Sequence, residues 1–252
     1  MKSAITLFAV AGLSVSAHGG LIAAQWNFNS NPADGSSSTG SLLASAGDNA
    51  ASASLSLLGG LTSTFASGTS NGGSSDPALT DNTGLNTTNF AAQGTGSGTR
   101  GVQFNASTVG FDGVVVSWDL RFSNTSSRYL QFQYTTDRTA STPVWVAAGG
   151  STVNGVNNII TGASAGDTWL RNISVDLSSA AGVASNANFA FRIVAVFDPN
   201  GAGNQYTAAS SGSSYGTAST WRFDLVTVVP TPGSAALIAL GGLMASRRRR
   251  GV

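Results

Sequence analysis

Alternating apolar and polar residues mark a series of short segments from about residue 101 onward. A period of two places successive side chains on opposite faces of a β-strand, so each run predicts a half-buried strand. Turn-forming sequences separate the runs. The runs are Val114 to Arg121, Leu130 to Tyr134, Val144 to Val146, Leu170 to Leu177, Phe189 to Phe197 and Trp221 to Leu225, and the turns are Asn154-Gly155, Gly162 to Asp167 and Asp198-Pro199-Asn200-Gly201.

The earlier part of the chain, residues 29–99, is rich in Gly, Ser, Ala, Asn and Thr. It predicts long loops joined to short strands, because its charges are too few for a swollen disordered chain. Within it we expect a strand at 54–58, a core contribution from Leu42 and Leu43, and an open loop at 67–75. Residues 25–228 show no sustained helical periodicity. The pattern predicts one all-β domain, an antiparallel β-sandwich of jelly-roll type.

The N-terminus reads as a secretory signal. Lys2 supplies a positive start, residues 4–15 form an apolar helix-length segment, and Val15-Ser16-Ala17 is a small-residue cleavage site. We predict a signal peptide over residues 1–17, with cleavage as late as residue 24 as a second option. A first core helix is the competing interpretation, which the lack of a polar face disfavours.

The last 24 residues, 229–252, have three parts: Pro230-Thr231-Pro232, an uncharged apolar stretch at 233–245, and a basic stop. A helix over 233–245 spans about 20 Å, against a hydrocarbon layer of roughly 30 Å. The two prolines prevent its extension toward the N-terminus. The stop, formed by Arg247, Arg248, Arg249 and Arg250, would stay on the cytoplasmic side.

This tail resembles the PEP-CTERM sorting domain of Gram-negative bacteria, in which Pro-Glu-Pro precedes the apolar segment. Thr231 here stands where that family has Glu. The resemblance implies transient retention in the inner membrane and cleavage near the motif by an exosortase-type enzyme. An uncut membrane anchor and a buried core helix are the other interpretations of the tail.

The amino-acid composition excludes most common kinds of catalytic site. The whole chain has a formal charge of +1, but residues 18–232 contain seven Arg and eleven Asp, a formal charge of −4. That region has no basic stripe for nucleic acid. The chain has no Cys and no Glu, a single Lys at position 2 and a single His at position 18. A Ser-His-Asp triad and a zinc site therefore lack their usual residues, and no phosphate-binding glycine loop occurs.

The aspartates allow two interpretations. Asp119 with Arg121, and Arg222 with Asp224, lie at i and i+2 on their predicted strands, so we expect cross-strand ion pairs. An Asp-dependent polysaccharide hydrolase, using Asp119 with Asp224 or Asp137, is a weaker alternative.

Two kinds of ligand are conceivable. Calcium would use Asp198 and Asn200, or Asp34, although Asp198-Pro-Asn-Gly is first of all a turn. A sugar could stack on Trp145, Tyr206 or Tyr215, with ordinary loop packing as the alternative for the two tyrosines. The strand tryptophans are expected in the core, namely Trp26, Trp118, Trp169 and Trp221. No other cofactor is expected.

The body of the chain, through 100–105, 116–125, 128–137 and 221–228, looks like that of many PEP-CTERM surface proteins. Those bodies are similar to lectin-like or galactose-binding-like jelly rolls, and they supply no catalytic residue to carry over. We therefore expect an exported, non-enzymatic protein with a structural or adhesive role in the envelope or the extracellular polysaccharide matrix, whose partners are signal peptidase and an exosortase-like enzyme. A carbohydrate-binding module, with polysaccharide as its partner, is the main alternative.

Overall fold

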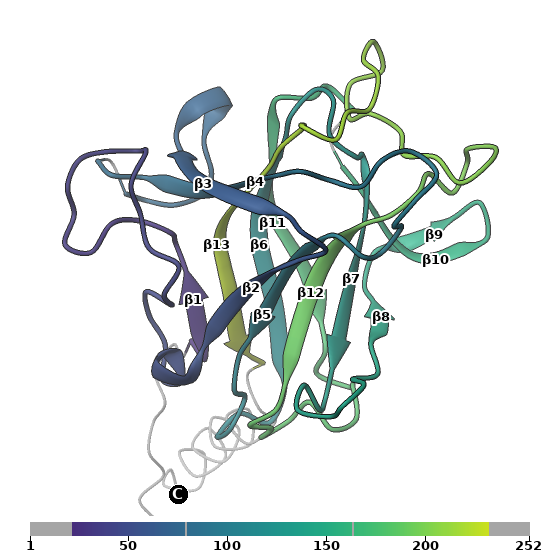
Figure 1. Cartoon of the computed structure of the whole chain (residues 1–252). Helices are drawn as coiled ribbons and strands as arrows, with labels where there is room; N and C mark the ends of the chain where they lie inside the picture. The colour runs from purple at the N-terminus through teal and green to yellow at the C-terminus, as the bar shows by residue number, and fades with distance from the viewer. Residues whose placement is uncertain (1–21, 79, 163, 232–252) are drawn as a thin grey trace, which may run out of the picture.

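Two antiparallel sheets account for all thirteen strands of the computed structural model, which describes residues 22–231 except 79 and 163. Sheet I has the order β11-β6-β13-β4-β3, with β1 paired to β13, and sheet II has the order β2-β5-β12-β7-β10-β9, with β8 paired to β7 (Figure 1). The strands of sheet I are β1 (Ala24–Trp26), β3 (Thr62–Ser67), β4 (Thr83–Thr88), β6 (Val114–Phe122), β11 (Thr168–Asp176) and β13 (Trp221–Pro230). Those of sheet II are β2 (Ser54–Leu58), β5 (Gly101–Asn105), β7 (Tyr129–Thr135), β8 (Val146–Ala148), β9 (Ser151–Val153), β10 (Val156–Thr161) and β12 (Ala190–Ala195).

Helix is confined, within the described part, to two short 3₁₀ turns, Ala50–Ser52 and Ser70–Gly72. No helix among these residues is long and apolar enough to cross a bilayer. The signal peptide, Pro232, the 233–245 helix and the four-arginine stop lie outside the described residues. The predicted all-β sandwich is confirmed for the body of the chain.

Aromatic side chains from both sheets fill the space between them. Trp118 of β6 stacks on Phe132 of β7, with ring centroids 5.7 Å apart. Phe104 of β5 contacts Trp26 of β1 and Phe223 of β13 edge-on. These residues are at most 1% exposed, so alternation along the strands placed the core correctly. Trp169 is also buried, but outside this core, where its Nε1 donates to the carbonyl of Ser70.

Bulges interrupt the alternation of two strands in sheet I. The register between β11 and β6 shifts between Leu170 and Ile173, where Asn172 has a φ of 55°. Leu170 and Ile173 consequently both pack against the core, although their spacing in an unbroken strand would place them on opposite faces. A matching shift interrupts β13 against β6 between Asp224 and Thr227.

The segment 67–75 is not the open loop expected from its composition. It packs against the outer face of sheet I, where Arg171 donates to the Gly73 carbonyl at 2.8 Å and Ser74 donates to Asp224 at 2.6 Å. Small side chains allow this close approach. Leu42 and Leu43 correct a second expectation, since they are 45% and 75% exposed and lie outside the core.

The expected ion pairs of Asp119 and Asp224 do not form, because the strand register pairs like charges. Asp224 lies opposite Asp119, and Arg222 lies opposite Arg121. Arg121 instead forms a 2.5 Å ion pair with Asp167 from the turn before β11. Two buried carboxylates are therefore left side by side under the 67–75 segment.

Candidate functional site

A row of polar side chains crosses the outer face of sheet II. In the registers of the sheet, Ser56 lies opposite Gln103, Gln103 opposite Arg192, and Arg192 opposite Gln133. Their sequence neighbours on the same strands point into the core, as alternation requires. With neighbouring strands about 4.8 Å apart, the row extends over roughly 14 Å from β2 to β7.

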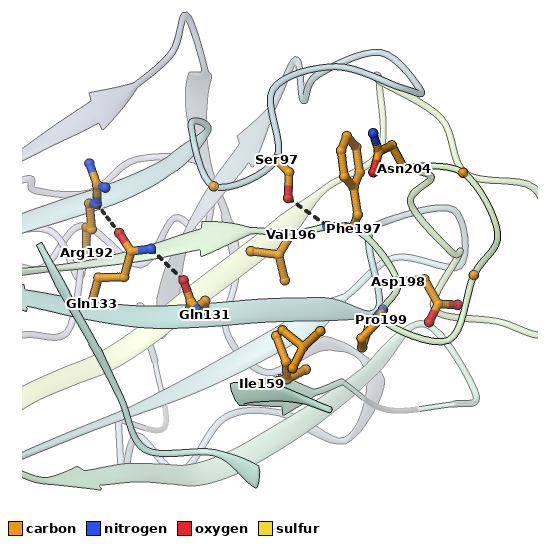
Figure 2. A pocket seen from close by; sticks show the side chains of 14 residues that line it. Ser97, Gln131, Gln133, Ile159, Arg192, Val196, Phe197, Asp198, Pro199 and Asn204 are labelled. Carbon is orange, nitrogen blue, oxygen red and sulfur yellow. Dashed lines mark hydrogen bonds between the residues drawn. The ribbon is translucent and has the colours of Figure 1, made fainter. Parts of the chain in front are cut away.

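Side-chain hydrogen bonds fix the central part of this row (Figure 2). Arg192 donates from Nε to Oε1 of Gln133 at 2.6 Å, and Gln133 donates from Nε2 to Oε1 of Gln131 at 2.5 Å. On the other side of Arg192, Gln103 donates to Asn105 at 2.9 Å. The amides are thus oriented by one another, while each keeps further donor and acceptor capacity.

Trp145 lies beside this row. It directly precedes β8, the strand paired to β7, and the guanidinium carbon of Arg192 lies 4.3 Å from its ring centroid. The geometry is that of a cation–π contact. The Trp145 side chain is partly buried, whereas the neighbouring Val144 and Val146 are 76% and 45% exposed.

The row forms part of a cleft of about 620 Å³. Gln131, Gln133 and Arg192 line it from the sheet, and Val156 and Ile159 line it from β10. The chain after β12 closes it with residues 196–199, 201, 203 and 204. This volume is in the range of ligand pockets in proteins. Figure 2 shows the amide row and Asp198 at separate places around the cleft.

A small apolar cluster supports the cleft, separate from the main core. It consists of Tyr129, Ile159, Val194 and Val196, with Leu58 and Val153 packed against it. The turn at Asn154 and Gly155, both at positive φ, brings β9 back along β10 and holds Val153 and Val156 at this edge. The cleft therefore has a rigid base with apolar and polar parts.

The guanidinium of Arg192 is half-buried, and burial lowers its pKa from the usual value. The guanidinium stays charged at neutral pH, because its ordinary pKa lies far above 7. Apart from Asp198, the residues that line the cleft contain no carboxylate. Arg192 and the glutamine amides can donate hydrogen bonds to the oxygens of a ligand, and Trp145 places an aromatic ring beside them.

The two tyrosines proposed as sugar contacts are used in packing. Tyr206 is 3% exposed, stacks on Tyr215 with centroids 4.7 Å apart, and donates to the Thr95 carbonyl. Tyr215 donates to the Ala91 carbonyl at 2.7 Å. Burial raises the pKa of Tyr206 to about 12. This geometry favours ordinary packing, the other interpretation for these residues, and Trp145 remains the aromatic candidate.

The turn proposed for calcium is closed by its own hydrogen bonds. Asp198 accepts from the Asn200 backbone N–H at 2.8 Å and from the Thr207 hydroxyl at 2.6 Å. Asp34 likewise accepts from the Thr39 hydroxyl and from the Ser36 backbone N–H, and these hydrogen bonds lower its pKa. Over the described ranges, no three or more His or Asp side chains are grouped to hold a metal. The turn expected from Asp-Pro-Asn-Gly is formed.

The pair suggested for a hydrolase lies on the opposite sheet from the cleft. Asp119 and Asp224 are 1% and 0% exposed, and Asp119 accepts from the backbone N–H groups of Ser75 and Asn172. Burial, in the first place, raises the pKa of Asp224 to about 8. Carboxylates enclosed in this way do not reach a polymer outside, so their geometry does not support glycoside hydrolysis.

Sequence reasoning missed the amide row itself. Gln131, Gln133 and Arg192 were recognisable as the outward positions of alternating strands, but nothing in the sequence placed β7 beside β12. Three outward polar residues indicate a site only if they are neighbours in space, and that requires the strand order. Gln103 was missed for the same reason.

Comparisons with known proteins find similarity of shape alone. No family model matches the chain, and no curated protein matches it. Similar solved structures include the xylan-binding CBM22-1 domain of Paenibacillus barcinonensis Xyn10C, with 11% identity, a TM-score of 0.44, and coverage of 85% of this chain and 97% of that one. The CBM22-1–GH10 modules of Clostridium thermocellum Xyn10B, complexed with xylohexaose, show 13% identity and a TM-score of 0.39 over 72% of this chain and 26% of that one. The K3 cleaved adhesin domain of Lys-gingipain from Porphyromonas gingivalis shows 13% identity and a TM-score of 0.33 over 71% and 92%.

Similarities at this level carry no argument about a ligand, since unrelated functions share such sandwiches. The site must therefore be judged from its own geometry.

Proposed function

We propose that the chain is a non-enzymatic carbohydrate-binding protein of the cell surface or extracellular matrix, built on a jelly-roll-like sandwich. The observation that carries the proposal is the contact of Trp145 with Arg192, beside the cleft that Arg192, Gln133 and Gln131 line. The apolar C–H face of a sugar ring packs on an aromatic side chain. Its hydroxyls need planar groups that donate and accept, which glutamine amides supply. A purely structural or adhesive role is the competing proposal.

We expect Trp145→Ala to weaken polysaccharide binding by about tenfold or more, because an aromatic contact contributes roughly 0.5–1.5 kcal/mol in addition to the apolar area that it buries, and about 1.4 kcal/mol corresponds to tenfold. The melting temperature should stay close to that of the wild type. Glycan-array screening would select a bound polymer, and isothermal titration calorimetry would give the affinities. Tyr206→Phe is the control, since it removes a buried hydroxyl from the rejected aromatic candidate and should leave binding unchanged.

A wild-type protein without selective signal on the array would refute carbohydrate binding and leave the structural role. Equal binding by wild type and Trp145→Ala would place the site elsewhere on the molecule.

Export and sorting form the second part of the proposal, supported by the sequence of the two ends. Signal peptidase would remove the N-terminal segment, and an exosortase-like enzyme would cut near Pro230 to Pro232 after transient membrane retention. Mass spectrometry of the mature protein from its native envelope should find an N-terminus between residues 18 and 25 and a C-terminus near this motif. A C-terminus still ending in Arg250-Gly251-Val252 would contradict processing and indicate an uncut anchor.

A further inference from the structure

Arg192 differs from every other arginine in the described part of the chain. Each of the other six donates from a terminal guanidinium nitrogen to a protein oxygen; they are Arg100, Arg121, Arg128, Arg138, Arg171 and Arg222. Arg192 donates through Nε to Gln133. Among the described residues, its two terminal nitrogens have no protein acceptor.

Among the described residues, no carboxylate forms an ion pair with Arg192. The side chain is half-buried, and the only ion pair within the described ranges is that of Arg121 with Asp167. The face of Trp145 compensates part of the charge. Asp198, the carboxylate that shares the cleft, is held by Asn200 and Thr207 in its own turn. Partial burial of a cation without an anion costs free energy, which an anionic ligand would offset.

The orientation of Arg192 suits one kind of anion. Gln133 accepts a hydrogen bond from Nε of the guanidinium, and Gln133 is itself oriented by its hydrogen bond to Gln131. The N–H groups on the edge formed by Nη1 and Nη2 therefore remain available to a ligand. A carboxylate matches such an edge with two parallel hydrogen bonds, which is the strong bidentate geometry of arginine.

We propose that the cleft selects acidic polysaccharides, and that Arg192 receives the carboxylate of a uronic acid unit while the sugar packs at Trp145. This inference rests on the carbohydrate-binding function proposed above. It adds acidic glycans as the ligand class, because a neutral glycan would leave the guanidinium charge without an anionic partner.

The test compares each acidic polymer with its own neutral form. The full chain is titrated with polygalacturonate, alginate and glucuronoxylan, and with the same polymers after reduction of their carboxyl groups. We expect at least one acidic polymer to bind about tenfold or more tightly than its reduced form, the size of one charge-assisted contact. Arg192→Gln should bring the two affinities within about twofold, and Arg192→Lys should restore part of the difference, since lysine keeps the charge without the fork.

Arg171→Gln is the matched control, because it removes the same charge from the outer face of sheet I. It should retain the preference, which separates a specific contact from general charge attraction. Circular dichroism and thermal melting confirm that each variant is folded. A preference that survives in Arg192→Gln would overturn the role of Arg192.

Two other results separate this inference from the function on which it rests. Equal affinity for acidic and reduced polymers, with loss of both in Trp145→Ala, would refute acid selection and leave carbohydrate binding in place. Absence of binding to all of these polymers and on the neutral glycan array would refute both proposals.

Discussion

Replacing Asp224 with Asn is expected to raise the free energy of unfolding above pH 8, while near pH 4 the variant should be no more stable than the wild type. Burial is the main cause that raises the pKa of Asp224 to about 8, and the nearby Asp76 and Asp119 add to it. The ordinary value, which applies to the unfolded chain, is 3.8. The folded state thus binds this proton more tightly than the unfolded state.

The direction of the pH dependence follows from that difference. The contribution of Asp224 to stability is fully present below pH 3.8 and is lost progressively as the pH rises to about 8. The loss is on the order of 5 kcal/mol. Asn cannot ionise, so the variant avoids this decline. Its Oδ1 can accept from the Leu225 N–H as the carboxylate does, and its Nδ2 can donate to the Ser74 hydroxyl, reversing the present hydrogen bond.

Urea denaturation of both proteins from pH 4 to pH 9 measures the effect. As the pH rises across this interval, the unfolding free energy of Asp224→Asn should increase relative to that of the wild type. Asp112→Asn is the control, because Asp112 is exposed and its replacement should leave the pH dependence of the wild type in place. Parallel curves for the wild type and Asp224→Asn would show that the carboxyl titrates normally.

Trp118→Ala is expected to lower the free energy of unfolding by about 3–5 kcal/mol, as truncation of large buried aromatics does. Trp118 is 1% exposed and stacks on Phe132 across the two sheets. Its Nε1 is buried without an acceptor among the described residues. Removing that unsatisfied donor offsets part of the loss, so we expect the lower half of this range.

The matched control is Trp145→Ala, which deletes the same atoms from the outer face of sheet II. It should cost clearly less stability than Trp118→Ala, because Trp145 is only partly buried, while it weakens polysaccharide binding. Chemical denaturation and calorimetric titration of the two variants would thus give opposite results. Equal losses of stability would contradict the assignment of Trp118 to the core and Trp145 to the surface site.

Alternation along single strands was sufficient to predict the β-sandwich and its core. The side chains of Phe189, Phe191, Ile193, Trp221 and Phe223 face inward as expected, because a strand buried on one face allows one register of its side chains. Leu225, expected on the same face, lies outside the core: the bulge between Asp224 and Thr227, where Leu225 has a φ of 44°, places Val226 inward instead. The bulge in β11 could not be predicted, since Asn172 at positive φ changes which residues share a face. Strands β3 and β4 could not be predicted either, because they consist largely of small polar residues without a clear alternation. Whether such segments form strands depends on the strands that lie beside them.

The candidate site depends on which strands lie side by side in the sheet. Trp145 was found because an aromatic residue near a loop is conspicuous by itself. Arg192 and its glutamines form a site only when β12 lies beside β7, a long-range pairing that sequence spacing does not determine. The same limit explains the ion pairs wrongly expected for Asp119 and Asp224, because residues two apart on a strand reveal nothing about the strand opposite.

The position of β13 has a mechanical consequence. This last strand lies inside sheet I, where one edge forms eight residue pairs with β6 and the other edge is shared by β4 and β1. A load applied at Thr231 would therefore enter the domain through an interior strand. Such a strand must shear ladders on both sides at once, whereas an edge strand can be peeled away one hydrogen bond at a time. We therefore expect a pull at Thr231 to meet more resistance than it would if β13 were an edge strand.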